Sequence, residues 1–321
     1  MTKKIIFSTG GTGGHVFPAI NLMKHFYKKG YSVLLVTDNR GESFIKNYPE
    51  FKSYILTADT PTNKNYFKKI LSLFVILFSV LKSIYILKKE KPNLIFGFGG
   101  YVSFPISFAS KFFGLPLFIY ENNVILGRAN QLLLRISKKI FTAHELKNNF
   151  PSKFENKICQ VGSILDKDII NSTKIKKNEN NKLFLISVLG GSQGAEIFGK
   201  IIPPAIKRLK DEGYNVEINQ QCHKNQKHQI TQYYEKNKIK NNVFEFNKNI
   251  LDLLLSTDLA ISRCGASTTA ELVHTLTPFI AVPLPSSIDN HQYLNAKYYE
   301  NKGCCWLIDQ KNFNEQNLYE L

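Results

Sequence analysis

The two halves of this chain begin in the same way, with a short apolar run, a glycine-rich turn and a helical pattern. The first run, Ile5–Ser8, leads into Gly10–Gly14, and the second, Leu183–Leu189, leads into Gly190–Gly194. A buried strand that turns through glycines into a helix is typical of the first unit of a doubly wound parallel sheet. The repeat therefore predicts two α/β domains, for which 321 residues are sufficient.

Short apolar runs alternate with longer helical patterns along both halves, which favours parallel sheets with helices on both faces. The predicted strands are Lys4–Ser8, Ser32–Thr37, Leu94–Phe98, Leu117–Tyr120, Lys139–Thr142, Ile158–Val161, Leu183–Leu189, Val216–Asn219, Val243–Phe246, Leu259–Ser262 and Phe279–Val282. The predicted helices include Val16–Lys29, Thr268–Leu276 and Asn290–Lys302. A polar, charge-dense stretch, Asp166–Lys182, reads as a linker. We expect domains at residues 1–164 and 165–321.

Charge and cysteine content limit the possible classes of protein. The 42 basic and 25 acidic residues give a net charge of +17, which attracts a phosphorylated substrate, an acidic membrane surface or nucleic acid. A lysine-rich solvated surface explains the charge equally well. A nucleic-acid-binding protein would carry basic and aromatic residues on a recognisable module, and the sequence has none. The five cysteines form no zinc-binding spacing, and we expect reduced thiols in a cytosol.

The stretch Ile70–Leu87 contains 14 apolar residues in 18 and predicts an unusual helix. Its serines share one narrow stripe with Lys68, whereas Phe74, Phe78 and Tyr85 align on another side. We expect this helix to dock on the membrane without spanning it, because it lies inside a β–α–β unit. The alternative is a fully buried core helix. The flanking lysines suited to anionic lipid are Lys64, Lys68, Lys69, Lys82, Lys88, Lys89 and Lys91.

The first glycine loop fits an anion better than a dinucleotide. Asp38 ends the second predicted strand, where the ribose-binding acid of an NAD site would lie, but the GxGxxG pattern fails because position 16 is Val16. The loop can still bring backbone amides to an anion at a helix N-terminus. His15 follows directly and could act as a general base, although a lone histidine is more often a packed residue.

Other polar loops follow predicted strands, at the ends where parallel sheets bind ligands. They are Gly97–Tyr101, Glu121–Asn123 and Gly265–Glu271. Small hydroxyl residues at a helix N-terminus can bind a phosphate. Glu271, about one turn into its helix, could accept hydrogen bonds from ribose hydroxyls, or could simply stabilise the helix dipole.

Six motifs occur together in one order: GGTGGHVFPA (Gly10–Ala19), GFGGYVSFP (Gly97–Pro105), YENN with GRAN (Tyr120–Asn130), LGGSQGA (Leu189–Ala195), SRCGASTTAEL (Ser262–Leu272) and DNHQYLNA (Asp289–Ala296). On these motifs, which span nearly the whole chain, it resembles the bacterial N-acetylglucosaminyltransferases that complete the lipid-linked disaccharide precursor of peptidoglycan. The resemblance implies a GT-B fold, in which two Rossmann-like domains face a cleft.

The family's activity would make the chain an inverting glycosyltransferase of cell-wall biogenesis. The donor, UDP-N-acetylglucosamine (UDP-GlcNAc), would bind the C-terminal domain. The acceptor, undecaprenyl-diphospho-N-acetylmuramoyl-pentapeptide, would bind the N-terminal domain and attack through its C4 hydroxyl. The family implies no cofactor or metal, and a peripheral location on the cytoplasmic face of the bacterial inner membrane.

Carried over position by position, the resemblance makes His15 the candidate base. The implied substrate-binding residues are Thr12, Gly13, Gly14, Asn123, Ser192, Asn247, Ala266, Ser267, Thr268, Thr269, Ala270, Glu271 and Gln292, with His291 beside the last of them. The hinge departs from the family's pattern, because Asp166, followed by Lys167, stands where an arginine is expected. The family's C-terminal helical tail is also largely missing after Leu321, so we expect weaker domain closure or a truncated chain.

Two alternative functions remain open. A related enzyme of the same fold, such as a 2-epimerase or a glycolipid transferase, would also use a UDP-sugar, but the epimerases lack the paired GGTGGHVFP and GFGGYVSFP motifs. A non-catalytic sensor of sugar nucleotides would carry the same binding motifs. A measurement of turnover separates the sensor from an enzyme.

Overall fold

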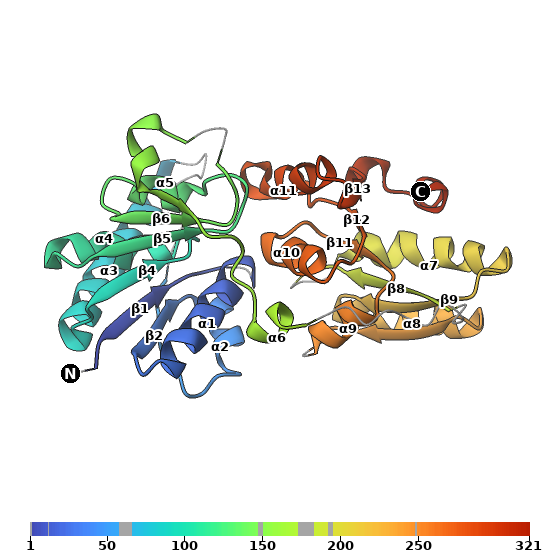
Figure 1. The fold of residues 1–321 in the computed structure, drawn as a ribbon, viewed down its shortest axis with the longest axis horizontal. Coiled ribbons are helices and arrows are strands. Elements are labelled where there is room, and N and C mark those ends of the chain that lie inside the picture. The colour runs from blue at the N-terminus through green and yellow to red at the C-terminus, as the bar shows by residue number, and fades with distance from the viewer. Residues whose placement is uncertain are drawn as a thin grey trace. The chain divides into compact units, whose positions relative to one another are not determined.

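A computed structural model describes residues 2–11, 13–57, 66–146, 150–172, 183–191, 195–247 and 249–321, with the side chains of the third range described from residue 70 onward. The chain divides into two compact units, Met1–Asp166 and Lys167–Leu321, called here the N-terminal and C-terminal units. Each unit contains one parallel sheet with helices on its two faces (Figure 1).

The N-terminal unit is built on a seven-stranded sheet with the order β3-β2-β1-β4-β5-β6-β7. Its strands are β1 (Lys4–Ser8), β2 (Ser32–Thr37), β3 (Lys52–Ile55), β4 (Leu94–Gly97), β5 (Leu117–Glu121), β6 (Lys139–Thr142) and β7 (Ile158–Gln160). Its α-helices are α1 (Gly13–Lys28), α2 (Asn39–Ile45), α3 (Tyr66–Glu90), α4 (Ser103–Ala109) and α5 (Arg128–Leu133). The strand order reverses between β1 and β4, and ligands bind at such a switch point in doubly wound folds.

Alternate residues of β1 fill two separate cores in this unit. Phe7 faces the core that contains Met23 of α1, whereas Ile6 faces the core that contains Ile106 of α4. All four side chains are fully buried. Because both faces are covered, the central strands are apolar on both sides, as parallel sheets require.

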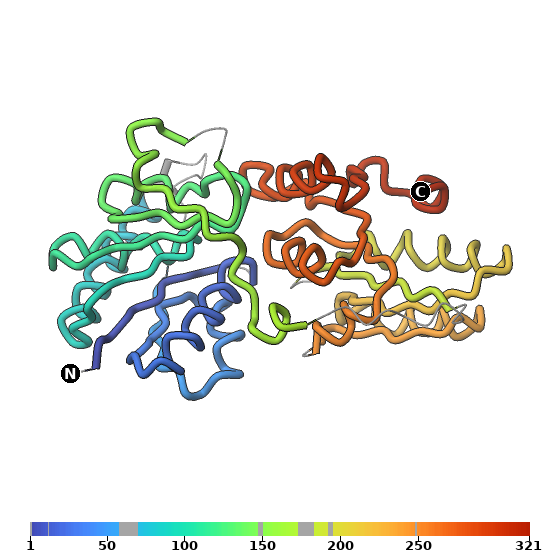
Figure 2. Tube along the Cα trace, in the orientation of Figure 1, coloured from blue at the N-terminus to red at the C-terminus, as the bar shows by residue number. Residues whose placement is uncertain are grey.

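The C-terminal unit repeats this design with a six-stranded parallel sheet of order β10-β9-β8-β11-β12-β13. The path of the chain through this unit, coloured from green through yellow to red, can be followed in Figure 2. Its strands are β8 (Phe184–Leu189), β9 (Val216–Gln221), β10 (Lys240–Phe244), β11 (Leu259–Ser262), β12 (Phe279–Ala281) and β13 (Cys305–Leu307). Its α-helices are α6 (Lys167–Ile170), α7 (Glu196–Asp211), α8 (Lys227–Lys236), α9 (Ile250–Ser256), α10 (Ala266–His274), α11 (His291–Glu300) and α12 (Glu315–Glu320).

Helix α3 directs its polar stripe toward the protein and its apolar side outward. Ser72, Ser79 and Ser83 are at most 1% exposed, whereas Phe74 and Phe78 are 64% and 69% exposed. The other large apolar side chains of α3 that are more than half exposed are Leu71, Leu73, Leu77, Leu81 and Tyr85. The alternative of a fully buried core helix is therefore wrong.

Within the described ranges, α3 is the one helix that is long and apolar enough to cross a membrane. The qualifying stretch, Ile70–Glu90, has a mean hydropathy of 2.4 and is 33% buried. Length and composition alone do not distinguish a span from a helix that lies on a surface. The side chains of Lys64, Lys68 and Lys69, which belong to the predicted basic flank, lie outside the described part.

A buried carboxylate fixes the end of α3 to the sheet. Glu90 is 6% exposed and accepts hydrogen bonds from Lys4 Nζ at 2.9 Å, Lys52 Nζ at 2.6 Å and the Tyr54 hydroxyl at 2.5 Å. Burial alone would raise the pKa of Glu90, but the hydrogen bonds from Lys52, Tyr54 and Lys4 outweigh it and lower the pKa to about 2. The ionised carboxylate thus joins α3 to β1 and β3.

We expect Glu90→Gln to lower the free energy of unfolding by up to about 3 kcal/mol at pH 7, since each unit of pKa shift corresponds to about 1.4 kcal/mol. A carboxyl with a depressed folded-state pKa stabilises the protein above its unfolded pKa. It loses that contribution as the pH falls through the folded value. The difference between wild type and variant in urea unfolding should therefore shrink between about pH 4.5 and pH 2. Exposed Glu50→Gln is the control, and a difference independent of pH would contradict this prediction.

Candidate active site

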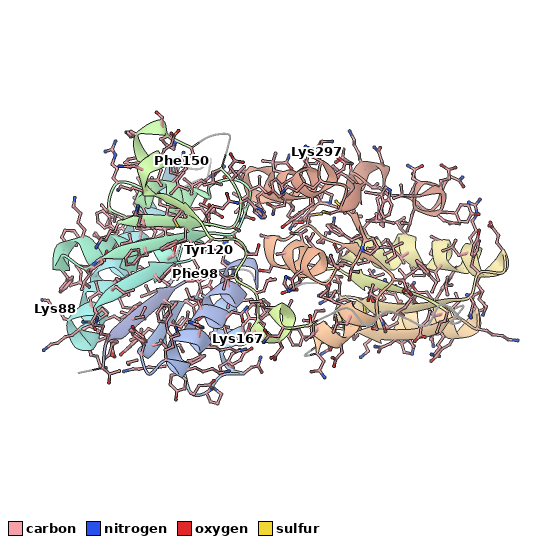
Figure 3. The ribbon with its side chains drawn as sticks, in the orientation of Figure 1. Lys88, Phe98, Tyr120, Phe150, Lys167 and Lys297 are labelled. Carbon is pink, nitrogen blue, oxygen red and sulfur yellow. The ribbon has the colours of Figure 1, made fainter. Side chains whose placement is uncertain are left out.

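Two glycine loops meet at the carboxyl edge of the N-terminal sheet, after β1 and β4. A Cβ atom on Gly100, which has a φ of +76°, would lie 2.7 Å from the carbonyl oxygen of Gly10. A Cβ atom on Gly10 would likewise lie 2.7 Å from Cβ of Val102. Only glycine permits this close approach of two backbones. The rings of Phe98 and Tyr120, 5.6 Å apart, lie at the ends of the neighbouring strands (Figure 3).

His15 lies in the first turn of α1 and packs against the second glycine loop. A Cβ atom on Gly99 would come within 3.3 Å of both Cε1 and Nδ1 of His15. Nδ1 is buried while the residue as a whole is only half-buried, so Nε2 is the ring nitrogen that a substrate hydroxyl could reach. Asn122 Nδ2 donates to the carbonyl oxygen of Gly14 at 3.2 Å and so ties the end of β5 to this turn. Thr12 lies outside the described residues.

Glu121 organises the loop that carries Asn123. Its carboxylate is 1% exposed and accepts hydrogen bonds from the backbone and side chain of Asn123 at 3.0 Å, from Gly127 N at 2.9 Å and from Asn130 Nδ2 at 2.9 Å. Glu121 is part of the YENN motif, but the motif alone predicted no role for it. An acid at the very end of a buried strand was the signal that could have identified it.

The side chain of Asp166 forms its ion pair with a residue of the N-terminal unit. Its carboxylate forms an ion pair at 2.9 Å with Lys24 of α1. Burial works to lower the pKa of Lys24, but the hydrogen bond to Asp166 and the nearby Tyr48 outweigh it and raise the pKa. The resemblance leads one to expect an arginine at this position. The aspartate found there carries no positive charge, and it contacts α1. Lys167 is the first residue of α6.

Only part of the predicted donor-binding segment at the N-terminus of α10 is accessible to a ligand. Thr269 is fully buried, and its hydroxyl donates to the carbonyl oxygens of Gly265 at 3.1 Å and Ala266 at 3.2 Å. Ala270 is also buried, so neither of these side chains faces solvent. What α10 can offer an anion is its first-turn amides, which have no acceptor within the helix. Thr268 and Glu271 are half-buried, and Ser267 is buried at 9% exposure.

Side chains of helix α11 form hydrogen bonds with the loops that follow β11 and β12. Gln292 Oε1 accepts hydrogen bonds from Cys264 N at 3.2 Å and Leu284 N at 3.0 Å, while Asn295 Nδ2 donates to the carbonyl oxygen of Cys264 at 3.2 Å. Gln292 therefore uses its oxygen for the protein, and its amide nitrogen is the end that a sugar hydroxyl could use. His291 contacts the carbonyl oxygen of Ile288 through Nδ1 at 2.7 Å.

Arg263 is a buried residue of this site that the sequence analysis did not single out. It is 8% exposed and donates to the carbonyl oxygens of Val282 at 3.0 Å and Pro283 at 3.1 Å, and to Gln310 Oε1 at 2.6 Å. Burial lowers its pKa. The guanidinium thus joins the end of β11 to the loop after β12 and to Gln310.

The remaining predicted residues are placed as follows. Asn247 lies three residues beyond β10, and its Oδ1 accepts a hydrogen bond from Asn249 N at 2.8 Å. Gly13 is the first residue of α1, and Gly14 is bound through its carbonyl oxygen to Asn122. Ser192 lies outside the described residues. Within the described ranges, no cluster of histidine, cysteine, aspartate or glutamate side chains could hold a metal ion.

Comparison with known proteins identifies the class to which this fold belongs. The N-terminal domain model of glycosyltransferase family 28 matches residues 5–142, and the family's C-terminal domain model matches residues 185–321. The crystal structure of Acinetobacter baumannii MurG is similar with a TM-score of 0.76 and 26% identity, covering 99% of this chain and 89% of that one. A putative UDP-N-acetylglucosamine 2-epimerase from Listeria monocytogenes, with a TM-score of 0.67 and 14% identity, covers 100% of this chain and 86% of that one and shows the fold alone.

Curated relatives narrow the class to one family. A protein of Pelagibacter ubique is 37% identical over 320 residues, which cover 99% of this chain and 88% of that protein. A protein of Rickettsia canadensis is 38% identical, with 98% and 88% covered. Both are named UDP-N-acetylglucosamine–N-acetylmuramyl-(pentapeptide) pyrophosphoryl-undecaprenol N-acetylglucosamine transferase, and the present chain belongs to this family. The family and the GT-B fold predicted from the six motifs are thereby confirmed.

Proposed function

We propose that this chain is the hexosyltransferase that moves N-acetylglucosamine from UDP-GlcNAc to the C4 hydroxyl of undecaprenyl-diphospho-N-acetylmuramoyl-pentapeptide. The observation that carries the proposal is the identity of 35–38% to curated transferases of that name over 98–99% of the chain. The product is the lipid-linked disaccharide from which peptidoglycan is built. We assign the acceptor to the N-terminal unit and the donor to the C-terminal unit.

The reaction is a displacement with inversion at the anomeric carbon. The C4 oxygen of the acceptor forms the new bond as the bond between the anomeric carbon and the UDP oxygen breaks, and the hydroxyl proton passes to His15 Nε2. The charge that develops on UDP is stabilised by the first-turn amides and the dipole of α10. Amides fixed in direction by helix geometry need no reorganisation during the reaction, and this lowers its barrier.

The test of this function is incubation of the full chain with radiolabelled UDP-GlcNAc and the lipid-linked muramyl-pentapeptide. Label should enter the lipid phase only when both are present. Conversion of UDP-GlcNAc to another UDP-sugar without acceptor would instead indicate an epimerase. Tight UDP binding with no turnover would indicate a sensor, and either result would contradict the proposal.

Glu271→Ala is expected to weaken UDP-GlcNAc binding by about 1–3 kcal/mol, roughly 5- to 150-fold, because a charged hydrogen bond to the ribose is lost. Titration calorimetry with UDP-GlcNAc measures this change. The matched control is Glu235→Ala, which removes an exposed glutamate from α8 of the same unit. A donor dissociation constant equal to that of the control would remove Glu271 from the donor site.

The exposed side of α3 supports a location on the membrane. We assign the acceptor's lipid to a bilayer on which this side rests, at the cytoplasmic face, without crossing it. Seven large apolar side chains of α3 are more than half exposed, and Lys82, Lys88 and Lys89 are exposed near its C-terminal half. Lysines next to an apolar face favour anionic lipid by up to about 1 kcal/mol each.

A further inference from the structure

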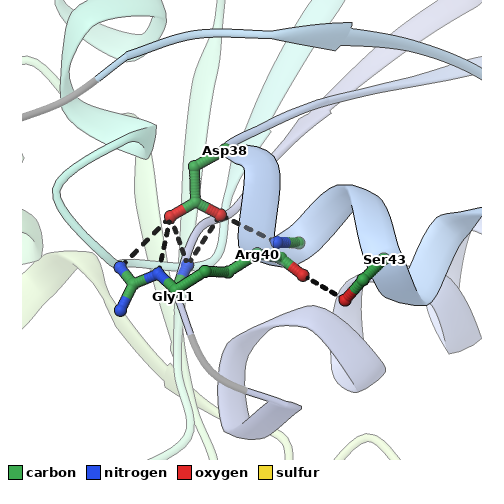
Figure 4. Close-up of polar contacts among 5 residues, drawn as sticks. Gly11, Asp38, Arg40 and Ser43 are labelled. Carbon is green, nitrogen blue, oxygen red and sulfur yellow. Dashed lines mark hydrogen bonds and ion pairs between the residues drawn. The ribbon is translucent and has the colours of Figure 1, made fainter.

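The carboxylate of Asp38 joins three segments of the N-terminal unit (Figure 4). Asp38 follows β2 and caps α2, where its Oδ1 accepts a hydrogen bond from Gly41 N at 2.8 Å. Both carboxylate oxygens also accept from Gly11 N, at 3.3 and 3.2 Å, and Arg40 donates to Oδ2 through Nε at 3.3 Å and Nη2 at 3.2 Å. The Asp38 side chain is 14% exposed.

The contact with Gly11 exceeds what a helix cap requires. An N-cap needs one oxygen and one or two amides of its own first turn, whereas Gly11 lies 27 residues earlier in the first glycine loop. Gly10, in the same loop, packs closely against Val102 and Gly100. The start of α1, which carries Gly13, Gly14 and His15, therefore follows a loop that is held on both sides.

The charges of this cluster determine which amides an anion can use. The negative Asp38 carboxylate occupies the Gly11 amide, so a substrate phosphate cannot bind there. The phosphate is left with the first-turn amides of α1, a 16-residue helix whose dipole favours an anion. Arg40 compensates the Asp38 charge, and its Nη2 lies 3.6 Å from the point that a Cβ atom of Gly11 would occupy.

We propose that Asp38 and Arg40 form a positioning pair that sets the first glycine loop for the diphosphate of the acceptor. Asp38 fixes the loop through Gly11, and Arg40 cancels the negative charge that would otherwise repel the diphosphate. This inference rests on the proposed function, because it is the acceptor's diphosphate that the loop would receive. Neither residue contacts the reacting atoms.

The first experiment compares Asp38→Ala and Asp38→Asn with the control Asn314→Ala. Asn314 caps α12 in the C-terminal unit by accepting a hydrogen bond from Asn317 N at 2.9 Å. Asn314→Ala therefore removes a helix cap without changing a contact to a glycine loop. Asp38→Ala should raise the acceptor KM about tenfold or more and leave UDP binding unchanged. Asp38→Asn keeps the acceptor oxygen for Gly11 and Gly41 and should restore most of the loss. An acceptor KM that moves no more than in Asn314→Ala would overturn the proposal.

Arg40 is tested through charge. Arg40→Gln should raise the acceptor KM, with less effect as ionic strength increases, and Arg40→Lys should largely restore it. In the double variant Asp38→Asn/Arg40→Gln, the free-energy change calculated from the acceptor KM should be smaller than the sum of the changes in the two single variants, because no uncompensated carboxylate remains. Strictly additive losses would show that Arg40 acts independently of Asp38.

Hydrogen exchange separates a failure of this inference from a failure of the proposed function. In Asp38→Ala, the backbone amides of residues 8–17 should exchange faster than in wild type and in Asn314→Ala, whether or not the chain transfers sugar. Unchanged exchange in this segment would overturn the positioning role. Absence of transfer by the wild type, with faster exchange in the variant, would overturn the proposed function and leave the loop contact standing.

Discussion

Replacing His15 by alanine is expected to lower kcat by about 10²–10⁴-fold, the usual contribution of a general base, while UDP-GlcNAc binding stays near wild type. The expectation rests on geometry, because the buried Nδ1 packs against Gly99 and leaves Nε2 to receive the proton of the attacking hydroxyl. Loss of the base removes an interaction made in the transition state, so kcat should fall more than the KM of either substrate changes.

His25→Ala is the matched control for this experiment. His25 lies in the last turn of the same helix and packs edge-on against Phe26, away from the glycine loops. Single-turnover measurements with saturating donor and acceptor isolate the chemical step. A decrease below about tenfold in His15→Ala, or an equal decrease in His25→Ala, would assign His15 a packing role instead of the proton transfer.

The central strands were predictable because burial on both faces leaves them continuously apolar. Lys4–Ser8, Ser32–Thr37, Lys139–Thr142 and Leu259–Ser262 have the predicted bounds. Two strands, β3 (Lys52–Ile55) and β13 (Cys305–Leu307), were not predicted, and both lie at sheet edges. Edge position alone does not explain this, because strands were also predicted at the edge strands β7 and β10. β3 has no fully buried residue and β13 has only three residues, and patterns this polar or this short cannot be told from a loop.

The loops of the site were predictable, whereas the contacts that fix them were not. Glycines and small hydroxyl residues after apolar runs marked the loops that follow β1, β4 and β11, and the polar residues Glu121–Asn123 marked the loop that follows β5. Asp38, Glu121 and Arg263 act through hydrogen bonds to residues distant in the chain or to backbone groups, and these leave no periodic signal. The direction of the Thr269 side chain could not be predicted from the sequence either, because a hydroxyl in the first turn of a helix can face a ligand or form a hydrogen bond with its own helix.

The double variant Phe74→Ser/Phe78→Ser is expected to weaken association with anionic vesicles by about 2–4 kcal/mol, roughly 30- to 1000-fold. Full burial of a phenylalanine contributes about 1.5–3 kcal/mol, and Phe74 and Phe78 are 64% and 69% exposed, so about two thirds of this contribution is expected from each. Flotation should rise with the anionic lipid fraction and fall with salt, since the lysines act within a Debye length of the surface. The control, Tyr214→Ser/Trp306→Ser, removes two exposed rings from the C-terminal unit and should float as wild type does.

The contacts on the polar side of α3 support the proposal that this helix docks on the membrane without spanning it. Ser79 donates to the carbonyl oxygen of Thr57, Lys82 donates to that of Ile55 at 2.8 Å, and Glu90 is held by three donors of β1 and β3. A helix that crossed the bilayer would break all of these contacts and place its charged ends in hydrocarbon or beyond it. Alkaline carbonate should therefore release the protein from vesicles. Resistance to carbonate would show a true span, and equal flotation with neutral and anionic vesicles would show that the lysines take no part in docking.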